Sequence, residues 1–489
     1  MKNMHLNKKI AVLFLLGGAF LMPTSCKKEL LDPAPLNSLS DKTIFSTPDR
    51  FLSLVNGIYD NLKSGQLYGG RAIVYGDIRA EEFLNETGNG VTGLQTWNHT
   101  VVESSNEVNN LWNAAYATIN GCNIFIEGAD INRAVVNNDA LVNQYIAEAR
   151  FVRALCYHTL LRSYCRPYAD GNGSQPGVPL RLRAETGPEN NDLARATVAE
   201  VYAQILDDLN FAEANLAATN GSALLNTTRA HKNSAIALKT RVYLGMQRYG
   251  DVITEANKIV PAAAPYKAAS GVAHELQAAV KNVFTTPYTT TESIFSMPFT
   301  TNDLPGTQNG LGSYYNPGPR GIGDFSLNPA GIIGDSVGFA GNDARRQFVF
   351  INTNNKPYLN KFPVGPEHLD YAPVIRYAEV LLNLAEAEAR ANGITDRAVS
   401  LLNAVRARSG GSAYSNTSFA SGDALASAVL KERRVELLGE GFRAFDSMRL
   451  LANIPGKANV AAIFPTVSEY IWPIPSGELA VNKLCVQNP

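Results

Sequence analysis

The side chains in this sequence that could bind a small polar ligand gather in two stretches, residues 64–99 and 300–324. The candidates are, in order, Tyr68, Asp77, Arg79, Trp97, Tyr314, Tyr315, Asn316 and Arg320. Aromatic rings beside amide, carboxylate and guanidinium groups suit a sugar, because the pyranose C–H face lies on the ring while the polar groups satisfy the hydroxyls. Sugars are well hydrated, so we expect modest affinity unless several rings are engaged together.

Most of these residues also have a structural interpretation. Trp97 precedes the first long predicted helix and suits a core anchor as well as a platform, and Asp77 and Arg79 could simply pair with each other. Tyr314 and Tyr315 are the strongest candidates, because two adjacent aromatics in a loop rich in Gly, Pro and Asn have little local reason to pack. On this interpretation, Tyr315→Ala weakens binding and leaves the melting temperature unchanged.

Catalysis is not indicated by the acidic residues. A glycosidase needs two carboxylates held a defined distance apart across a cleft. The adjacent pairs Glu81–Glu82 and Asp207–Asp208 are explained as solvated charges, and no P-loop of the GxxxxGK[ST] form occurs. We therefore predict that the protein is not an enzyme and uses no cofactor.

Metal binding is not indicated either. The six histidines are scattered, without HxxxH spacing, and no CxxC pair occurs, which argues against a zinc site. Residues 170–173 resemble the start of a calcium loop, but Arg181 stands where an EF-hand loop has its twelfth-position Glu. We interpret these residues as a plain turn.

The N-terminus has the pattern of a secretory signal. Residues 1–25 combine three lysines with an apolar run over residues 10–22, which is short for a membrane-spanning helix. Cys26 follows small residues, as at a lipoprotein cleavage and acylation site, although Pro23 fits that pattern loosely and a plain secretory signal is the alternative. Removing residues 1–25 takes the net charge from −1 to −4, because three lysines and no acids are lost. Nucleic acid is therefore not expected as a partner.

The other four cysteines are expected to be free and mostly buried. Cys156 and Cys165 are nine residues apart on one predicted helix, which places them on opposite faces. Cys122 and Cys156 lie on consecutive helices whose antiparallel register does not align them. We therefore predict no disulfide framework.

Helical spacing dominates the chain. Apolar residues recur at steps of three and four in residues 49–62, 106–127, 141–164, 197–216, 232–260 and 378–409, with breaks near residues 249–251 and at Gly393. The last two segments resemble tetratricopeptide hairpins without a strict 34-residue period. Residues 262–373 are mostly non-helical, and a loop of this length is usually functional. Within it, residues 300–324 look most exposed.

Residues 431–450 are predicted to form one charged helix wedged into the body of the protein. Arg434, Asp446 and Arg449 project toward its apolar half, where an unpaired charge costs about 3–5 kcal/mol, so we expect them to be paired. Glu436 and Glu440 fall on the opposite side and are expected to face water. A solvated amphipathic helix with incidental charges is the alternative.

The chain resembles the SusD/RagB family of nutrient-binding outer-membrane lipoproteins over essentially its whole mature length. The motifs that carry the resemblance are weak singly and specific in their order. They are Cys26 with Leu30-Leu31-Asp32, Trp112-x3-Tyr116-x2-Ile119, Gly177-Val178-Pro179-Leu180, Thr197-x2-Glu200-x-Tyr202-x2-Ile205-x2-Asp208-Leu209, Arg376-Tyr377-Ala378-Glu379, Ala385-Glu386-Ala387, Arg433-Arg434-x-Glu436-Leu437, Glu440-Gly441-x-Arg443-x3-Asp446, Trp472-Pro473-Ile474-Pro475 and Gln487-Asn488-Pro489.

The resemblance implies a mainly all-α fold, in which tetratricopeptide-like hairpins form a right-handed superhelical scaffold under long irregular ligand-binding loops. It implies a signal peptide at 1–25, a lipidated tether at 26–45 and a single SusD-like domain at 46–489, with parts at about 46–260 and 261–489. It also implies an outer-membrane protein, anchored through acylated Cys26 and facing the exterior, that captures oligosaccharides and delivers them to a SusC-like TonB-dependent transporter without catalysis. Individual ligand residues vary in the family, so none carries over.

Two alternatives stay open at this point. Some relatives handle peptides, so the ligand could be a peptide instead of a glycan. A tetratricopeptide-like scaffold that holds another protein is a second possibility, which a lipoprotein signal together with the full-length resemblance disfavours.

Overall fold

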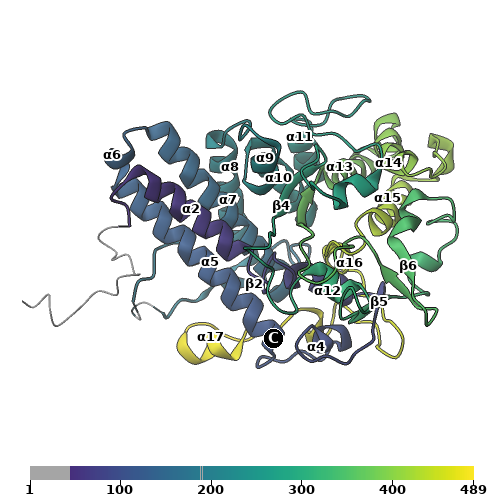
Figure 1. Cartoon of the computed structure of the whole chain (residues 1–489), viewed down its shortest axis with the longest axis horizontal. Coiled ribbons are helices and arrows are strands. Elements are labelled where there is room, and N and C mark those ends of the chain that lie inside the picture. Colours follow the sequence, from purple (N-terminus) through teal and green to yellow (C-terminus); the bar gives the residue numbers. More distant parts are fainter. Residues whose placement is uncertain (1–43, 188, 190, 489) are drawn as a thin grey trace, which may run out of the picture.

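The computed structural model of this chain describes residues 44–187, 189 and 191–488, so the predicted signal peptide, Cys26 and most of the predicted tether lie outside the described residues. Helices dominate the architecture (Figure 1). They are α2 (Pro48–Leu62), α3 (Arg71–Ile78), α4 (Leu94–Asn98), α5 (Asn106–Ile131), α6 (Arg133–Val136), α7 (Asp139–Tyr164), α8 (Val198–Asn215), α9 (Ala223–Thr228), α10 (Lys232–Gly245), α11 (Tyr249–Ala256), α12 (Leu311–Tyr315), α13 (Tyr377–Asn392), α14 (Asp396–Arg408), α15 (Gly422–Glu436), α16 (Arg443–Met448) and α17 (Ser476–Val481).

Short strands pair in antiparallel two-stranded sheets. The pairs are β1 (Phe83–Asn85) with β5 (Phe325–Leu327), β2 (Pro176–Pro179) with β3 (Arg195–Thr197), β4 (Ser293–Met297) with β8 (Ala372–Arg376), and β6 (Val349–Ile351) with β7 (Pro357–Leu359). Single 3-10 turns add η2 (Val280–Phe284), η3 (Ile332–Gly334), η4 (Ala344–Phe348), η5 (Asn416–Ser418) and η6 (Ser468–Tyr470). Most strands fall within residues 262–373, the segment predicted to be non-helical.

The helices form consecutive antiparallel hairpins, and the predicted mainly helical, tetratricopeptide-like fold is confirmed. Helices α5 and α7 lie side by side along one end of the molecule (Figure 1). Asn138 ends the turn between them, because its Oδ1 accepts a hydrogen bond from the Leu141 N–H at 3.1 Å. Helices α13 and α14 are separated at Gly393, whose φ is +75°. Thr395 then caps α14 by accepting from the Ala398 N–H at 3.1 Å.

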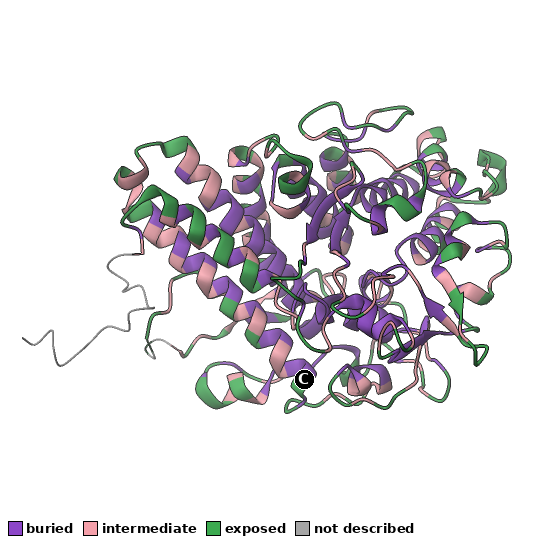
Figure 2. Cartoon of the chain, in the orientation of Figure 1, coloured by how far each residue is buried: buried purple, intermediate pink, exposed green. Residues whose placement is uncertain are grey.

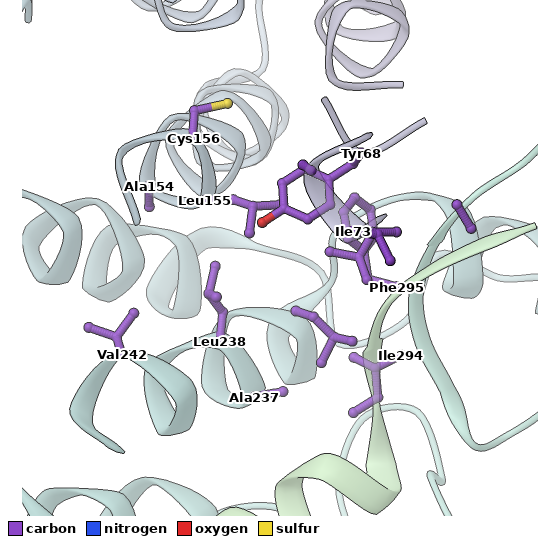
Figure 3. Packing of buried hydrophobic residues seen from close by; sticks show 14 of the residues in the cluster. Tyr68, Ile73, Ala154, Leu155, Cys156, Ala237, Leu238, Val242, Ile294 and Phe295 are labelled. Atoms are coloured by element: carbon purple, nitrogen blue, oxygen red, sulfur yellow. The ribbon is translucent and has the colours of Figure 1, made fainter. Parts of the chain in front are cut away.

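One continuous set of buried apolar residues runs from α2 to the C-terminal segment, and the exposed residues lie on the outer faces of the helices and in the loops (Figure 2). In its centre, Leu155 of α7, Leu238 of α10 and Phe295 of β4 point toward a common space, with Tyr68 above them (Figure 3). The apolar stripes that define the predicted hairpins therefore face this shared core. Dividing the chain near residue 260 stays a prediction.

Residues 431–450 do not form one helix, so that prediction is wrong. Helix α15 ends at Glu436 and α16 begins at Arg443. Between them, Gly439 and Gly441 both have a φ of +82°, a left-handed conformation that interrupts a helix and favours glycine. At Gly441 a Cβ would also lie 2.7 Å from the Ile73 carbonyl oxygen, so this break packs directly against α3.

The three inward charges of this segment are paired, as predicted. Arg449 contacts Asp446 at 2.9 Å, and Arg434 contacts Glu82 at 2.7 Å. Glu436 and Glu440 do not face water, because both are buried. They belong to an ion network that we call the Arg376 cluster; its members are Glu292, Lys361, Arg376, Arg408, Glu436 and Glu440.

In the Arg376 cluster, one guanidinium joins three segments. Arg376 of β8 contacts Glu292 at 2.6 Å, Glu436 at 3.0 Å and Glu440 at 2.6 Å. Burial alone would raise the pKa of Glu440, but Arg376 and Lys361 hold it below its usual value. The cluster therefore locks the end of α15 to the sheet that β4 and β8 form.

The described part of the chain contains four of the five cysteines. Cys122, Cys156, Cys165 and Cys485 are free and buried, as predicted. Among residues 44–488 with their two gaps, no helix combines the length and the apolar character that crossing a membrane requires.

Candidate functional site

The two stretches proposed for ligand binding meet in space. Strand β1 pairs with β5 in antiparallel register, with Phe83 opposite Leu327. The Phe83 ring also lies 5.0 Å from the ring of Tyr315, and the Thr87 hydroxyl donates a hydrogen bond to Asp324. Side chains from residues 64–99 and 300–324 therefore share one corner of the molecule, but most of them point into the core.

In the first stretch, Tyr68 and Asp77 are structural. The Tyr68 side chain is 3% exposed, and its hydroxyl is 2.8 Å from the Thr159 hydroxyl. Asp77 accepts a hydrogen bond from the Gly441 N–H at 2.7 Å, and burial raises its pKa to about 8. Asp77 thus holds the break between α15 and α16 against α3, and it is not placed to meet a ligand.

Arg79 and Trp97 are buried too. Arg79 Nη2 donates to the Tyr470 carbonyl oxygen at 3.1 Å, and burial lowers the pKa of its guanidinium to about 10. Within the part of the chain described, Asp77 and Arg79 form no ion pair with each other. Trp97 donates its Nε1–H to the Phe83 carbonyl oxygen at 2.8 Å, so it is the core anchor that its position allowed and not a platform.

The adjacent tyrosines do not form an exposed platform, and this expectation is wrong. Tyr314 and Tyr315 are fully buried in the short helix α12. The Tyr315 ring packs between Phe83 at 5.0 Å and Phe362 at 6.2 Å, and the Tyr314 hydroxyl donates to the Gln308 carbonyl oxygen at 2.6 Å. The packing partners come from distant parts of the chain, so local composition did not reveal them.

The Asn316 side chain is also hydrogen-bonded to backbone carbonyl groups. Its side chain is fully buried, and its Nδ2 donates to the carbonyl oxygens of Gly312 at 3.0 Å and Phe362 at 2.6 Å. These bonds tie the end of α12 to the segment after β7. The expected role of Asn316 in satisfying sugar hydroxyls is therefore not supported by its position.

Arg320 is the predicted residue that stays accessible. Its guanidinium lies 5.0 Å from the centroid of the Phe350 ring, and its Nη1 donates to Asn360 Oδ1 at 2.8 Å. Phe350, on strand β6, keeps 38% of its surface exposed although Arg320 lies over it. Glu86 and Lys356 form an ion pair nearby. We call these five residues the Arg320–Phe350 surface.

Phe350 was missed because it lies outside both chosen stretches. Its signal in the sequence is weak: Val349-Phe350-Ile351 precedes the polar turn Asn352–Lys356, a pattern typical of a hairpin with one outward-facing side. In the structure Phe350 stands opposite Tyr358 across the hairpin, and the turn residues are mostly exposed. An exposed aromatic ring beside amide and guanidinium donors can stack on an apolar face and bind hydroxyls.

Of the adjacent acidic residues, Asp207 is exposed as expected, but Glu82 and Asp208 are not. Glu82 is 2% exposed and contacts Arg434 at 2.7 Å, and Asp208 is fully buried against Arg153 at 2.7 Å. Each of these carboxylates is neutralised by an arginine. They are held in ion pairs inside the protein and do not face each other across a cleft.

Two glycine patterns that are typical of functional sites in other proteins lie in a different structural context here. Residues 334–338 have GxSxG spacing, but Ser336 is exposed in a turn after η3 and not at the strand-to-helix turn of a nucleophile elbow. Residues 88–93 have GxGxxG spacing, but the strand before them pairs antiparallel with β5 and helix α4 after them has five residues.

Among the described residues, no three His, Cys, Asp or Glu side chains are grouped to hold a metal ion.

Comparison with known protein families gives two matches that together cover most of the chain. Residues 30–244 match a family described as starch-binding and associating with the outer membrane. Residues 326–489 match the SusD family. The two matches fall on either side of the segment that contains β4 and α12.

Individual proteins are similar over nearly their full lengths. SusD-like protein P2 of Formosa agariphila is 25% identical over 94% of this chain and 95% of its own length. A SusD superfamily protein of Bacteroides fragilis is 33% identical, with a TM-score of 0.80 over 90% of this chain and 99% of that structure. A laminarin-binding SusD-like protein, 21% identical with a TM-score of 0.72, covers 91% of this chain and 99% of that structure, which shows a shared fold.

Proposed function

The chain belongs to the SusD family, and on this premise we propose that it captures oligosaccharides through the Arg320–Phe350 surface and delivers them to a SusC-like TonB-dependent transporter. SusD-like proteins are carbohydrate-binding and non-catalytic, so the chain is not an enzyme. The observation that carries the choice of surface is the exposed ring of Phe350 with the guanidinium of Arg320 beside it.

The geometry of this surface suits a neutral sugar. Phe350 offers an apolar ring edge and face, while Arg320 uses one of its N–H groups on Asn360 and has others available for hydroxyls. The ion pair between Glu86 and Lys356 adds a carboxylate acceptor and an ammonium donor at the rim. Because Phe350 and Arg320 remain accessible to solvent, several weak contacts must combine, and we expect modest affinity for a single saccharide unit.

Isothermal titration of the lipid-free protein against a glycan panel and a peptide digest tests this proposal. We expect heat with at least one glycan and at least a tenfold loss of affinity in Phe350→Ala. Phe464→Ala is the matched control, because Phe464 is an exposed phenylalanine outside the Arg320–Phe350 surface. Heat with peptides alone would overturn the sugar assignment, and unchanged glycan binding by Phe350→Ala would place the site elsewhere.

We also propose that the protein is held at the outer membrane, facing the exterior, by acylation of Cys26. This residue lies outside the described residues, so its support is the sequence pattern and the family. Cys26→Ala is expected to release the protein from washed membranes, measured by fractionation. Retention of the variant on membranes would count against acylation as the anchor.

Delivery to a transporter can be separated from a general scaffold role. We expect a gene for a large TonB-dependent transporter next to the gene for this chain, and recovery of that transporter when the lipidated protein is purified in mild detergent. An isolated gene and recovery of a different protein would favour the tetratricopeptide-like interaction scaffold.

A further inference from the structure

A small cavity lies inside the helical scaffold, away from the Arg320–Phe350 surface. It has a volume of about 50 Å³ and is bordered by α7, α8, α10, α15 and α16. Its charged and polar lining includes five arginines against one carboxylate; these residues are His158, Arg162, Arg166, Tyr168, Tyr202, Arg241, Arg433, Asp446 and Arg449. A space of this size holds about three to five water molecules, or one small oxyanion in their place.

Four of the five arginines have carboxylate partners. The pairs are Arg166 with Asp170 at 2.6 Å, Arg241 with Glu379 at 2.6 Å, Arg433 with Asp446 at 2.9 Å, and Arg449 with Glu386 at 2.6 Å. These interactions balance the charge of the arginines that make them. The remaining cation, Arg162, therefore sets the charge of the cavity.

Arg162 lacks an anionic partner. Within the described part of the chain, no carboxylate lies within 4.0 Å of its guanidinium, and its buried Nε has no hydrogen-bond partner. The guanidinium instead lies 4.3 Å from the centroid of the Phe445 ring. Arg162 is only partly exposed, so a buried N–H without an acceptor and a guanidinium whose nearest described partner is a ring face both favour an added anion.

His158 places a second unsatisfied group in the same cavity. Its side chain is 1% exposed, and its Nδ1 has no hydrogen-bond partner. Burial and the neighbouring Arg162 lower the pKa of this imidazole, so the ring is neutral and can donate a hydrogen bond from one ring nitrogen. Arg162 and His158 thus line the same small space, next to Tyr202.

We propose that this cavity binds one oxyanion between Arg162 and His158. A sulfate, phosphate or carboxylate group supplies the counter-charge that Arg162 lacks and can accept a hydrogen bond from the imidazole. Arg162, Arg166 and Tyr168 are all partly exposed, so the cavity is reached from solvent on their side. The anion is either a free inorganic ion or the acidic substituent of a saccharide whose ring stays at that opening.

Thermal melting of the lipid-free protein tests the proposal. The melting temperature is measured in sodium sulfate or sodium phosphate and compared with that in sodium chloride of equal ionic strength. We expect a saturable rise in melting temperature and at least a tenfold weaker apparent affinity in Arg162→Met. Sulfate also stabilises proteins in general, so a matched control is needed. Arg150→Met supplies it, because Arg150 is on the same helix, stacks on Phe211 at 4.3 Å and does not line the cavity.

Glucose 6-sulfate and glucuronate, with glucose as the neutral control, distinguish the two sources of the anion. Binding of the acidic sugars without inorganic sulfate or phosphate assigns the cavity to a saccharide substituent; binding of the inorganic ions assigns it to a free ion. A melting rise that Arg162→Met retains in full, or that chloride matches, overturns the proposal. If Arg162→Met does not fold, wild-type crystals soaked in selenate provide a second test by anomalous diffraction. Selenium in the cavity would support the proposal, and its absence there would contradict the proposal.

Discussion

Arg376 and Arg320 carry the same guanidinium group in opposite surroundings. Arg376 is 2% exposed and contacts carboxylates of Glu292, Glu436 and Glu440, so its donors are used within the protein. Arg320 is only partly buried, and its contacts are a phenylalanine ring and one amide oxygen. An arginine whose donors are fully used by carboxylates stabilises the fold, whereas one with donors left over can bind a ligand.

The largest expected effect is at the Arg376 cluster. Arg376→Met should lower the free energy of unfolding by about 5 kcal/mol, because three buried carboxylates lose the one cation that contacts all of them. Urea denaturation followed by circular dichroism measures the loss. Arg320→Met is the control and should change the free energy by under about 1 kcal/mol. Similar losses in the two variants would contradict the contrast between the two arginines.

A second large effect is expected at Tyr315. Removing the ring in Tyr315→Ala leaves a cavity between Phe83 and Phe362 and should cost about 3–5 kcal/mol. Tyr315→Phe keeps the ring and should stay within about 1 kcal/mol, because the buried hydroxyl has no hydrogen-bond partner. Thermal melting of both variants checks this; an unchanged melting temperature in Tyr315→Ala would show that the ring is at the surface after all.

The free energy of unfolding is expected to depend on pH in acid because of Asp446 in α16. Burial alone would raise the pKa of Asp446, but Arg433 and Arg449 lower it to about 2, below the usual value of 3.8. Since the folded-state pKa is depressed, the stabilisation is complete above pH 3.8 and is lost as the pH falls toward 2, by about 2 kcal/mol.

Urea denaturation at pH 5, 3 and 2 measures this slope. In Asp446→Asn the part of the slope that comes from Asp446 should disappear, while Asp207→Asn, which changes an exposed aspartate, should retain it. An equal slope in wild type and Asp446→Asn would mean that other carboxylates account for acid unfolding.

The smallest effect on stability is expected at the binding surface. Phe350→Ala should change the free energy of unfolding by under about 1 kcal/mol, because the ring is already partly in water. Its effect should instead be on glycan affinity, which is the reverse of the result expected for Tyr315→Ala. A large fall in the melting temperature of Phe350→Ala would show that Phe350 is a structural residue and that the ligand binds elsewhere in the loops.

The hairpins were predictable because their signal is local. Apolar spacing and a break near residue 249 predicted α10 and α11, and Gly393 predicted the turn between α13 and α14. The candidate site was much less predictable. Of the residues chosen for ligand binding, Arg320 alone stays accessible at the proposed surface, and Phe350 had to be found from the β6–β7 hairpin.

By itself, the sequence determined the helical hairpins, the free cysteines, the pairing of the inward charges and the family. These properties depend on periodicity, on composition, on the order of short motifs and on the cost of burying a charge without a partner. Only the tertiary structure decided that Tyr315 packs between Phe83 and Phe362, and that Glu436 meets Arg376 and not water. The physical reason is that a side chain is buried by whatever lies opposite it. Here those neighbours come from segments far away in the sequence, which local spacing cannot identify.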